Sequence, residues 1–356
     1  MPLLFIAVAF FYGDFIMDYD KPFKSFKELA LCLQNEHGLM VDDVNQAAYI
    51  LQFLPYYDLV NGYKEILMTN DHFKWPLKIS DLAFFHSLDH NFQGSLISFS
   101  ISIEDYFKNI LAYVIAKSFS VSEGDYLDES HYIRRKPLGS GKTITRHAIL
   151  GNLKAIAAGT YDNPTFYYRK NHNHIPPWIL LKNTSFSLST NLFVLLPSKQ
   201  KEEVVDFMIP GGAPWDVRYQ ILLYSLTMIR KCRNVIAHNL KFTSFDSSRY
   251  MNNLDQKALR KLISPILLTD EEIKYSTYLS GIYGYIVLSL SIIPKGITHV
   301  LLVNRLHGAM TMDGIFSGSN LSDSLGKMKE IYFSGVHLPQ DVESRLNSYF
   351  AKMYEN

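Results

Sequence analysis

The sequence predicts an all-α fold, and three observations support that prediction. Apolar residues recur with the period of a helix over much of the chain, helix start and stop signals flank several of these runs, and strand-like alternation is rare. The 356 residues are enough for a sizeable buried core and for one large or two ordinary domains. No internal repeat or low-complexity tract is present in the sequence. We therefore expect a bundle of packed helices.

The N-terminal run of residues 2–12 is apolar but too short to span a membrane. No basic region precedes it and no small-residue cleavage site follows it, because aspartates come next. The segment that begins at Met17 resembles the natural start of a protein. We therefore expect residues 1–16 to be an upstream extension or a peripheral apolar strand.

Residues 1–75 as a whole are expected to form this extension and a small helical lobe. Residues 24–33 carry apolar side chains at helical spacing, and Ser25 with Glu28 three positions later forms a capping box. A second helix is expected over 44–54, because aspartates precede it at the positive end of the helix dipole. The aromatic-rich segment 55–63 then predicts a turn.

A central helical domain is expected over residues 76–270, followed by C-terminal helices over 271–356. The longest helical pattern lies at 215–237, directly after the Pro- and Gly-rich break at 210–214. A basic insertion is expected near 120–182, irregular over 120–148 and with a loop at 160–177. Apolar periodicity predicts the other helices over 79–92, 96–119, 151–158, 256–268, 271–293 and 341–354.

Charge is distributed unevenly, although the formal net charge is only +1. Residues 130–185 hold nine Lys and Arg against one acidic residue, whereas residues 1–60 hold three against eight. Clustered basic charge is typical of a protein that binds a phosphate-rich partner, and a solvated loop is the alternative for any single residue. Aromatic residues at 161 and 166–168 would stack RNA bases beside these charges. The predicted phosphate contacts are Arg134, Arg135, Lys136, Lys142, Arg146, Lys154, Arg169 and Lys170.

The candidate catalytic residues are Arg233 and His238, with Asn234 after the arginine. Arg is a permanent planar cation that binds phosphate oxygens through two hydrogen bonds, and His transfers a proton near neutral pH. This pair suits cleavage of an RNA phosphodiester without a metal. His238 would act as general base or acid, Arg233 would stabilise charge in the transition state, and Asn234 would orient the phosphate or the imidazole.

The spacing of this pair sets a geometric condition. Residues five positions apart are separated by about 140° around an ideal helix. Arg233 and His238 therefore converge only if the helix ends or bends near Ala237, or if two copies of the chain face each other. A surface arginine beside a helix-end histidine is the alternative interpretation, because this spacing is common.

Other motifs give weaker indications. Residues 136–143 lack the first glycine of a P-loop and follow no apolar strand, so they do not indicate an NTPase. His86 and His90 are spaced like metal ligands on a helix, and His172 and His174 lie together in a basic loop. Neither pair has further ligands that the sequence identifies. We therefore expect no metal and no other cofactor.

Two features bear on the compartment. Cys32 and Cys232 are two widely spaced thiols, which predict neither a disulfide framework nor a zinc site and fit a reducing cytosol. The apolar run 278–293 is shorter than a membrane span and carries Ser, Gly and Tyr, so we expect a buried core helix there. The sequence thus predicts a cytoplasmic protein without a membrane segment.

Several short motifs, taken in order, resemble the Abi family of bacterial abortive-infection proteins, of the AbiD/AbiF-like type. The resemblance covers about residues 18–245. Leu88 and His90 depart from the usual Phe and Lys/Arg, and the arginine expected after Glu104 is not evident. The motifs are Lys21-Pro22-Phe23, Leu39-Met40-Val41-Asp42-Asp43, the run from Tyr56 to Tyr63, Leu88-Asp89-His90, Ile103-Glu104, the run from Pro176 to Leu180, the run from Ser185 to Ser189, and the run from Arg233 to Asn239.

This resemblance implies membership of the HEPN superfamily of helical nucleases. It implies a HEPN-type helical bundle, a homodimer or RNA-bridged oligomer, and metal-independent RNA cleavage through Arg233 and His238, with Asn234 at the usual polar position. AbiF-type proteins are also associated with a structured small RNA, which we expect on the basic region 130–185. The leading expectation is a toxin-like endoribonuclease that leaves a 2′,3′-cyclic phosphate and a 5′-hydroxyl. The alternative is a non-catalytic RNA-binding or scaffold protein on the same fold.

Overall fold

A computed structural model describes residues 21–137, 143–160, 162–242, 245–248, 254–276, 278–311 and 322–354. These ranges contain eighteen α-helices, two short 3₁₀ helices and two two-stranded hairpins, which confirms the predicted all-α fold. The predictions for residues 1–16, for Lys142 and for Tyr161 lie outside the described residues. The predicted domain boundaries near 75 and 270 stay predictions.

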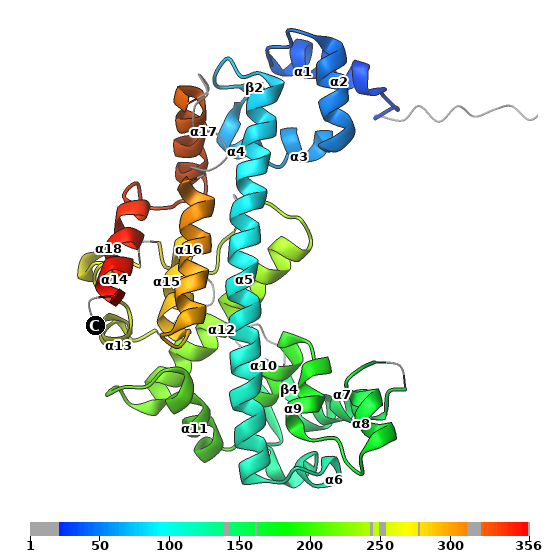
Figure 1. The fold of residues 1–356 in the computed structure, drawn as a ribbon, viewed down its shortest axis with the longest axis vertical. Helices are drawn as coiled ribbons and strands as arrows, with labels where there is room; N and C mark the ends of the chain where they lie inside the picture. The colour runs from blue at the N-terminus through cyan, green and yellow to red at the C-terminus, as the bar shows by residue number, and fades with distance from the viewer. Residues whose placement is uncertain are drawn as a thin grey trace, which may run out of the picture.

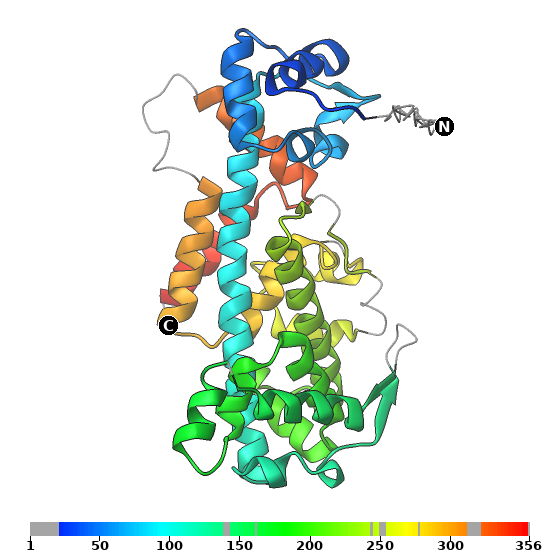
Figure 2. The same ribbon diagram turned by 90° about the vertical axis from the view of Figure 1, so that its right-hand side faces the viewer.

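One long helix, α5 (Ile79–Ser118, 40 residues), forms the axis of the molecule (Figures 1 and 2). The prediction of two helices, over 79–92 and 96–119, is therefore wrong. A Cβ at Gly94 would have no atom within 4 Å, so this glycine lies in open space on the helix surface. Its cost of about 1 kcal/mol relative to alanine is small beside the burial of Phe92 and Leu96, both 0% exposed.

A small lobe at the N-terminal end of α5 carries the predicted capping box. The backbone N–H of Ser25 donates to the Glu28 carboxylate at 2.6 Å, and the N–H of Glu28 donates to the Ser25 hydroxyl. Gly38, at φ 71°, ends the first helix. The elements of this lobe are α1 (Phe26–His37), α2 (Val44–Phe53), α3 (Tyr56–Val60), α4 (Lys64–Leu67), β1 (Met68–Thr69) and β2 (His72–Phe73).

A second group of elements surrounds the C-terminal end of α5 (Figure 1). The expected loop at 160–177 is wrong, because α8 lies there, and the buried Thr165 hydroxyl donates to the Asp162 carbonyl at 2.9 Å. The elements are α6 (Glu123–Tyr126), η1 (Glu129–His131), β3 (Arg135–Pro137), β4 (Thr143–Thr145), α7 (Arg146–Ala158), α8 (Thr165–Asn171), α9 (Pro177–Leu180), η2 (Leu181–Asn183), α10 (Phe186–Leu195) and α11 (Ser198–Met208). Strands β3 and β4 pair antiparallel, with Arg135 opposite Thr145.

The remaining helices close the core, and several of them pack directly against α5. The helix expected over 271–293 is divided, because Ser276 and Tyr278 adopt left-handed φ values of 55° and 65°. The backbone of Leu279 then lies so close to Gly284 that the Cβ of an alanine there would collide with it. The second part is the buried core helix that was expected, and two helices after it were not predicted. These elements are α12 (Trp215–Ala237), α13 (Gln256–Leu262), α14 (Asp270–Lys274), α15 (Ile282–Ile292), α16 (Ile297–Thr311), α17 (Ser322–Gly335) and α18 (Val342–Tyr354).

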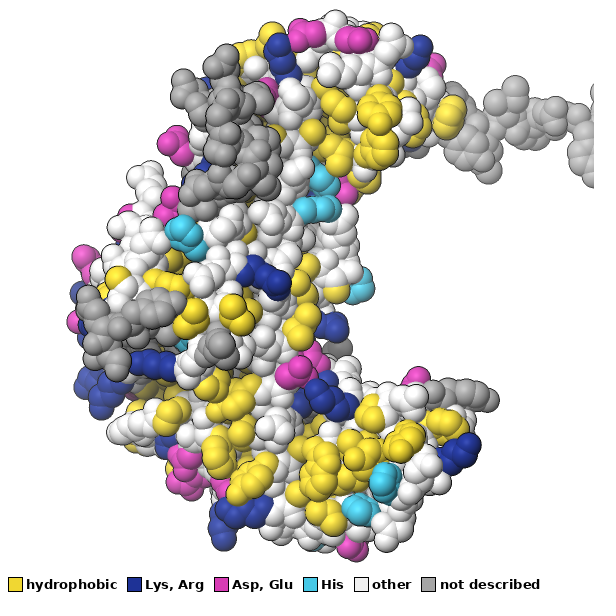
Figure 3. Space-filling view, in the orientation of Figure 1, with side chains coloured by type: hydrophobic (Ala, Val, Ile, Leu, Met, Phe, Trp, Pro, Cys, Tyr) yellow, Lys and Arg dark blue, Asp and Glu magenta, His cyan; other side chains and the backbone are white. Residues whose placement is uncertain are grey.

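The molecule is hollowed on one side. The N-terminal lobe and the α7–α9 region both project from the same side of α5, and the space-filling view shows a concave side between them (Figure 3). Histidine, basic and acidic side chains gather along this concave side. The C-terminal end of α12 lies beside α5 on this side (Figure 1). None of the helices in the described ranges combines the length and apolar composition that a membrane crossing requires.

Candidate active site at the end of α12

The candidate catalytic residues lie where α12 ends. The helix ends at Ala237, and His238 is its C-cap. Asn239 adopts φ 52°, and the N–H groups of Asn239 and Leu240 donate to the carbonyls of Ile236 and Val235 at 3.0 and 2.9 Å. This is a Schellman motif with asparagine in the left-handed position. The sequence allows Arg233 and His238 to form one site if the helix ends or bends near Ala237, or if two copies of the chain face each other. The observed end of α12 meets the first of these conditions.

The side chains of Arg233, Asn234 and His238 are all exposed. Nε of Arg233 lies 3.9 Å from Oε2 of Glu104 on α5, and 45% of the arginine side chain remains accessible. Among the described residues, none hydrogen-bonds the imidazole of His238, so a substrate can reach the ring. The described contacts include none between Arg233 and His238 themselves. Within one chain, Arg233 and His238 are therefore near each other in sequence, but their side chains are not in contact.

Glu104 connects Arg233 to the interior of the molecule. Its second carboxylate oxygen, Oε1, lies 2.7 Å from Nζ of Lys108, one helical turn along α5. Lys108 is 8% exposed and also donates to the carbonyl of Thr184 at 2.6 Å. The arginine therefore faces a carboxylate that is itself held by a buried lysine, which limits the positions that the guanidinium can occupy.

The three residues after His238 are tied to two elements, α3 and α5. The Asn239 amide donates to the Asp58 carboxylate at 3.3 Å, and the Gln93 amide donates to the carbonyl of Leu240 at 3.3 Å. Nζ of Lys241 lies 3.6 Å from Oδ2 of Asp89. These contacts fix the chain on the C-terminal side of the candidate histidine.

Asp89 is the centre of a buried polar cluster, which we define as Tyr63, Asp89, Gln93, Lys241 and Tyr332. Its carboxylate is 1% exposed and accepts hydrogen bonds from the hydroxyls of Tyr63 and Tyr332, both at 2.8 Å, and from the Gln93 amide at 3.0 Å. Nζ of Lys241 also lies 5.1 Å from the centre of the Tyr63 ring. Four neighbours therefore satisfy the buried charge, as its burial requires.

His86 adjoins this cluster. Its Nδ1 lies 3.1 Å from the Tyr63 hydroxyl, and its ring centre lies 4.1 Å from that of His90. Burial, together with the positive charges of Lys241 and His90, lowers the pKa of His86 to about 4. The imidazole is therefore neutral at physiological pH, which suits a structural partner of Tyr63.

Neither predicted histidine pair gathers a third metal ligand within the described residues. The ligand atoms of three His, Cys, Asp or Glu side chains approach one another only at Cys32, Glu36 and His37 on α1. There the ammonium of Lys24 lies 3.2 Å from Sγ of Cys32 and 3.4 Å from the Glu36 carboxylate. The ammonium of Lys24 thus places a positive charge beside these three side chains.

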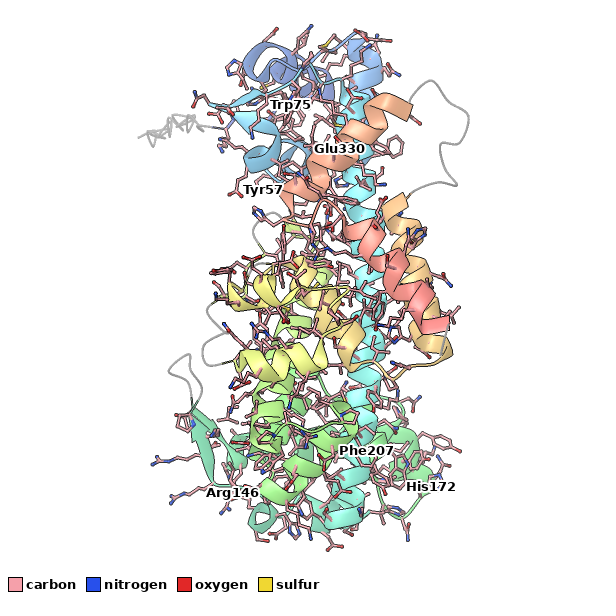
Figure 4. All side chains as sticks on the ribbon, turned by 90° about the vertical axis from the view of Figure 1, so that its left-hand side faces the viewer. Tyr57, Trp75, Arg146, His172, Phe207 and Glu330 are labelled. Carbon is pink, nitrogen blue, oxygen red and sulfur yellow. The ribbon has the colours of Figure 1, made fainter. Side chains whose placement is uncertain are left out.

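The predicted phosphate contacts are divided between two surfaces. Arg134, Arg135 and Lys136 are exposed at the β3–β4 hairpin, while the guanidinium of Arg146 donates to the Glu129 carboxylate at 3.2 Å and to the Tyr132 carbonyl at 3.0 Å. Lys154 on α7 is exposed, as are Arg169 and Lys170 in the last turn of α8. Figure 4 places Arg146 and His172, which follows α8, at opposite edges of this part of the molecule.

Sequence reasoning missed most of the buried cluster. Tyr63 and Asp89 were noted only as members of motifs, and Gln93, Lys241 and Tyr332 were not singled out. Lys241 could have been found from the apolar context on both sides of it. Tyr332 gave no signal, because it comes from a segment about 240 residues away from Asp89 along the chain.

The fold and the site define an all-helical protein with an exposed Arg/His pair at the end of a long helix. Residues 49–243 match the family model of the Abi-like protein. Because this match covers more than half of the 356 residues, the chain belongs to the Abi-like protein family. The matched range includes Asp58, Asp89, Glu104 and the whole candidate site. No curated protein and no solved structure matches the chain.

Proposed function

We propose that this protein is an abortive-infection endoribonuclease of the AbiD/AbiF-like type, built on a HEPN-type bundle, which cleaves RNA without a metal. The observation that carries this proposal is the common exposure of Arg233, Asn234 and His238 where α12 ends. A buried histidine already engaged by other side chains would have opposed it. Membership of the Abi-like family supports the same conclusion, because the family name refers to abortive infection.

The proposed reaction is transfer of an RNA phosphodiester to the neighbouring 2′-hydroxyl. A neutral histidine removes the 2′-hydroxyl proton, the 2′-oxygen attacks phosphorus, and the bond from phosphorus to the 5′-oxygen breaks. A protonated histidine supplies the proton to the leaving 5′-oxygen, which leaves a 2′,3′-cyclic phosphate and a 5′-hydroxyl. Arg233 binds the non-bridging oxygens as their charge rises, and Asn234 orients the phosphate or the imidazole.

Two proton transfers favour two copies of the site. Because one His238 cannot be base and acid at the same moment, a homodimer with twofold symmetry would bring a second His238 and a second Arg233 to the same phosphate. The exposed end of α12 leaves room for such an approach. Glu104 has a supporting part in this proposal, since it orients the Arg233 guanidinium from α5.

RNA is the proposed partner of the basic residues as well. The exposed side chains at the β3–β4 hairpin and on α7 and α8 carry positive charge suited to RNA phosphates. In this proposal a structured small RNA binds there and controls the nuclease. The protein itself then holds one RNA as a regulator and cleaves another as substrate.

Cleavage by matched variants tests the proposed function. Purified wild type, Arg233→Ala, His238→Ala and Asn234→Ala are incubated with total RNA in the presence of EDTA. We expect wild type to cleave, and loss of the proton-transfer group in His238→Ala to slow cleavage by a factor of about 10²–10⁴. His72→Ala is the control, because His72 is also an exposed histidine and lies on β2, outside the surfaces assigned to RNA. Equal rates for wild type and His238→Ala, or intact RNA with all proteins, would refute the nuclease and favour a non-catalytic RNA-binding protein.

A further inference from the structure

A pocket lies between α5 and the α9–η2 segment, close to the candidate active site. Its volume is about 350 Å³, and it is lined by Asp105, Tyr106, Lys108, Asn109, Trp178, Leu181 and Lys182. The proposed function uses none of these residues. Trp178 belongs to the proline-rich motif of the resemblance, for which the sequence offered no role.

Trp178 is an exposed tryptophan on a rigid support. Trp178 is 45% exposed, whereas Trp75 and Trp215 are both half-buried. Pro176 and Pro177, directly before it, are buried, and Pro177 begins α9. The preceding Ile175 is 1% exposed, and its carbonyl accepts a hydrogen bond from Tyr126 at 2.7 Å. The backbone that carries the indole is therefore fixed while the ring stays partly uncovered, as a stacking platform requires.

Polar groups surround the indole at the pocket. Nζ of Lys182 lies 3.1 Å from Oδ1 of Asp105, and both side chains are 58% accessible. The Asn109 amide offers a further donor and acceptor. A flat aromatic face beside hydrogen-bonding groups is the combination by which proteins hold an unpaired RNA base.

Lys108 links this pocket to the proposed active site. Its side chain lines the pocket, and its ammonium binds Oε1 of Glu104, while Oε2 of the same carboxylate faces Arg233. The pocket and the phosphate-binding arginine are therefore separated by one carboxylate and one lysine side chain. A nucleotide carries its base and its phosphate at opposite ends, so neighbouring sites of these two kinds fit one strand.

We propose that this pocket binds an unpaired RNA base next to the scissile phosphate, with Trp178 as the stacking residue. This inference rests on the proposed function for its substrate. The pocket selects single-stranded over double-stranded RNA, because a paired base cannot enter it. Lys182, Asp105 and Asn109 read the edge of the base.

Tryptophan fluorescence measures this binding without cleavage. The His238→Ala protein is titrated with a short single-stranded oligoribonucleotide, with its duplex and with AMP. We expect the single strand to quench the emission of Trp178. Because Trp178→Ala and Trp178→Phe lack this reporter, their affinities are measured from the fluorescence anisotropy of a dye-labelled strand. Trp178→Ala should bind about 5- to 150-fold more weakly, because stacking contributes about 1–3 kcal/mol per base. Trp178→Phe should keep most of the affinity, and the control Trp215→Phe should keep the quenching.

Several outcomes would overturn the inference. Unchanged affinity in Trp178→Ala excludes the stacking role, and equally tight binding of the duplex excludes an unpaired base. Binding of AMP as tight as that of the oligonucleotide indicates a free-nucleotide site instead. Thermal unfolding of each variant checks that it folds. If wild type cleaves RNA while Trp178→Ala binds normally, this inference alone fails; if wild type does not cleave, the proposed function fails and the binding result still stands.

Discussion

Removal of one charge from the buried polar cluster should destabilise the protein strongly. Lys241 and Asp89 have side chains that are 7% and 1% accessible, so neither charge is solvated when its partner is lost. Breaking a buried pair by removing one partner costs about 3–5 kcal/mol. In Lys241→Met the carboxylate keeps its hydrogen bonds from Tyr63, Gln93 and Tyr332, so we expect a cost of about 3 kcal/mol, at the low end of that range. In Asp89→Asn the ammonium loses its carboxylate, and we expect about 4 kcal/mol.

The double variant separates charge pairing from packing. Asp89→Asn/Lys241→Met removes both charges, so its free energy of unfolding should fall by less than the sum of the single variants, with a coupling of about 1–3 kcal/mol. Urea unfolding followed by circular dichroism measures each value. Lys257→Met, at an exposed position, is the control and should change stability by less than about 0.5 kcal/mol. Additive costs, or a cost below about 1 kcal/mol for Lys241→Met, would refute the reasoning.

Two further predictions concern charge at other places. The folded-state pKa of His86 is about 4, below its unfolded value near 6.5. The contribution of His86 to the free energy of unfolding is therefore complete above pH 6.5. It is lost as the pH falls toward 4, by up to about 3 kcal/mol. His86→Gln should flatten this part of the stability profile measured by urea unfolding between pH 7 and pH 4.5, and an unchanged profile would contradict the assignment. Replacing Arg134 and Arg135, or Arg169 and Lys170, by Gln should weaken RNA binding and lower the slope of log affinity against log salt. Filter binding at several salt concentrations measures this slope, and the two pairs show which surface holds RNA.

Local signals in the sequence predicted local structure well. Ser25 and Glu28 predicted the start of α1, and the end of the apolar pattern at Ala237 predicted the end of α12, because caps and periodicity depend on neighbours in the chain. Apolar periodicity predicted two helices in place of α5. The low helix propensity of Gly94, which lies between them, does not divide the helix, because tertiary packing along its whole length outweighs it.

Contacts between distant segments were beyond prediction. Periodicity shows that a residue is buried, but it does not show which element covers it. Asp89, Lys241 and Tyr332 meet only because α5, the chain after α12 and α17 pack together. The division of the basic region has the same origin: residues 134–136 and 169–170 are close in sequence, yet the fold turns them to different edges. Arg233 and Glu104 likewise required the packing of α12 on α5.

The continuous helix α5 also fixes the distance between the two regions at its ends. Its 40 residues at 1.5 Å per residue give a rod of about 60 Å. Asp89 lies near one end of this rod, and Glu104 and Lys108 lie farther along it. Because a helix without a break resists compression, the separation between the N-terminal lobe and the α7–α9 region is set by a residue count. A ligand that touches both ends of the concave side must therefore itself be tens of ångströms long, a length that an RNA strand reaches and a mononucleotide does not.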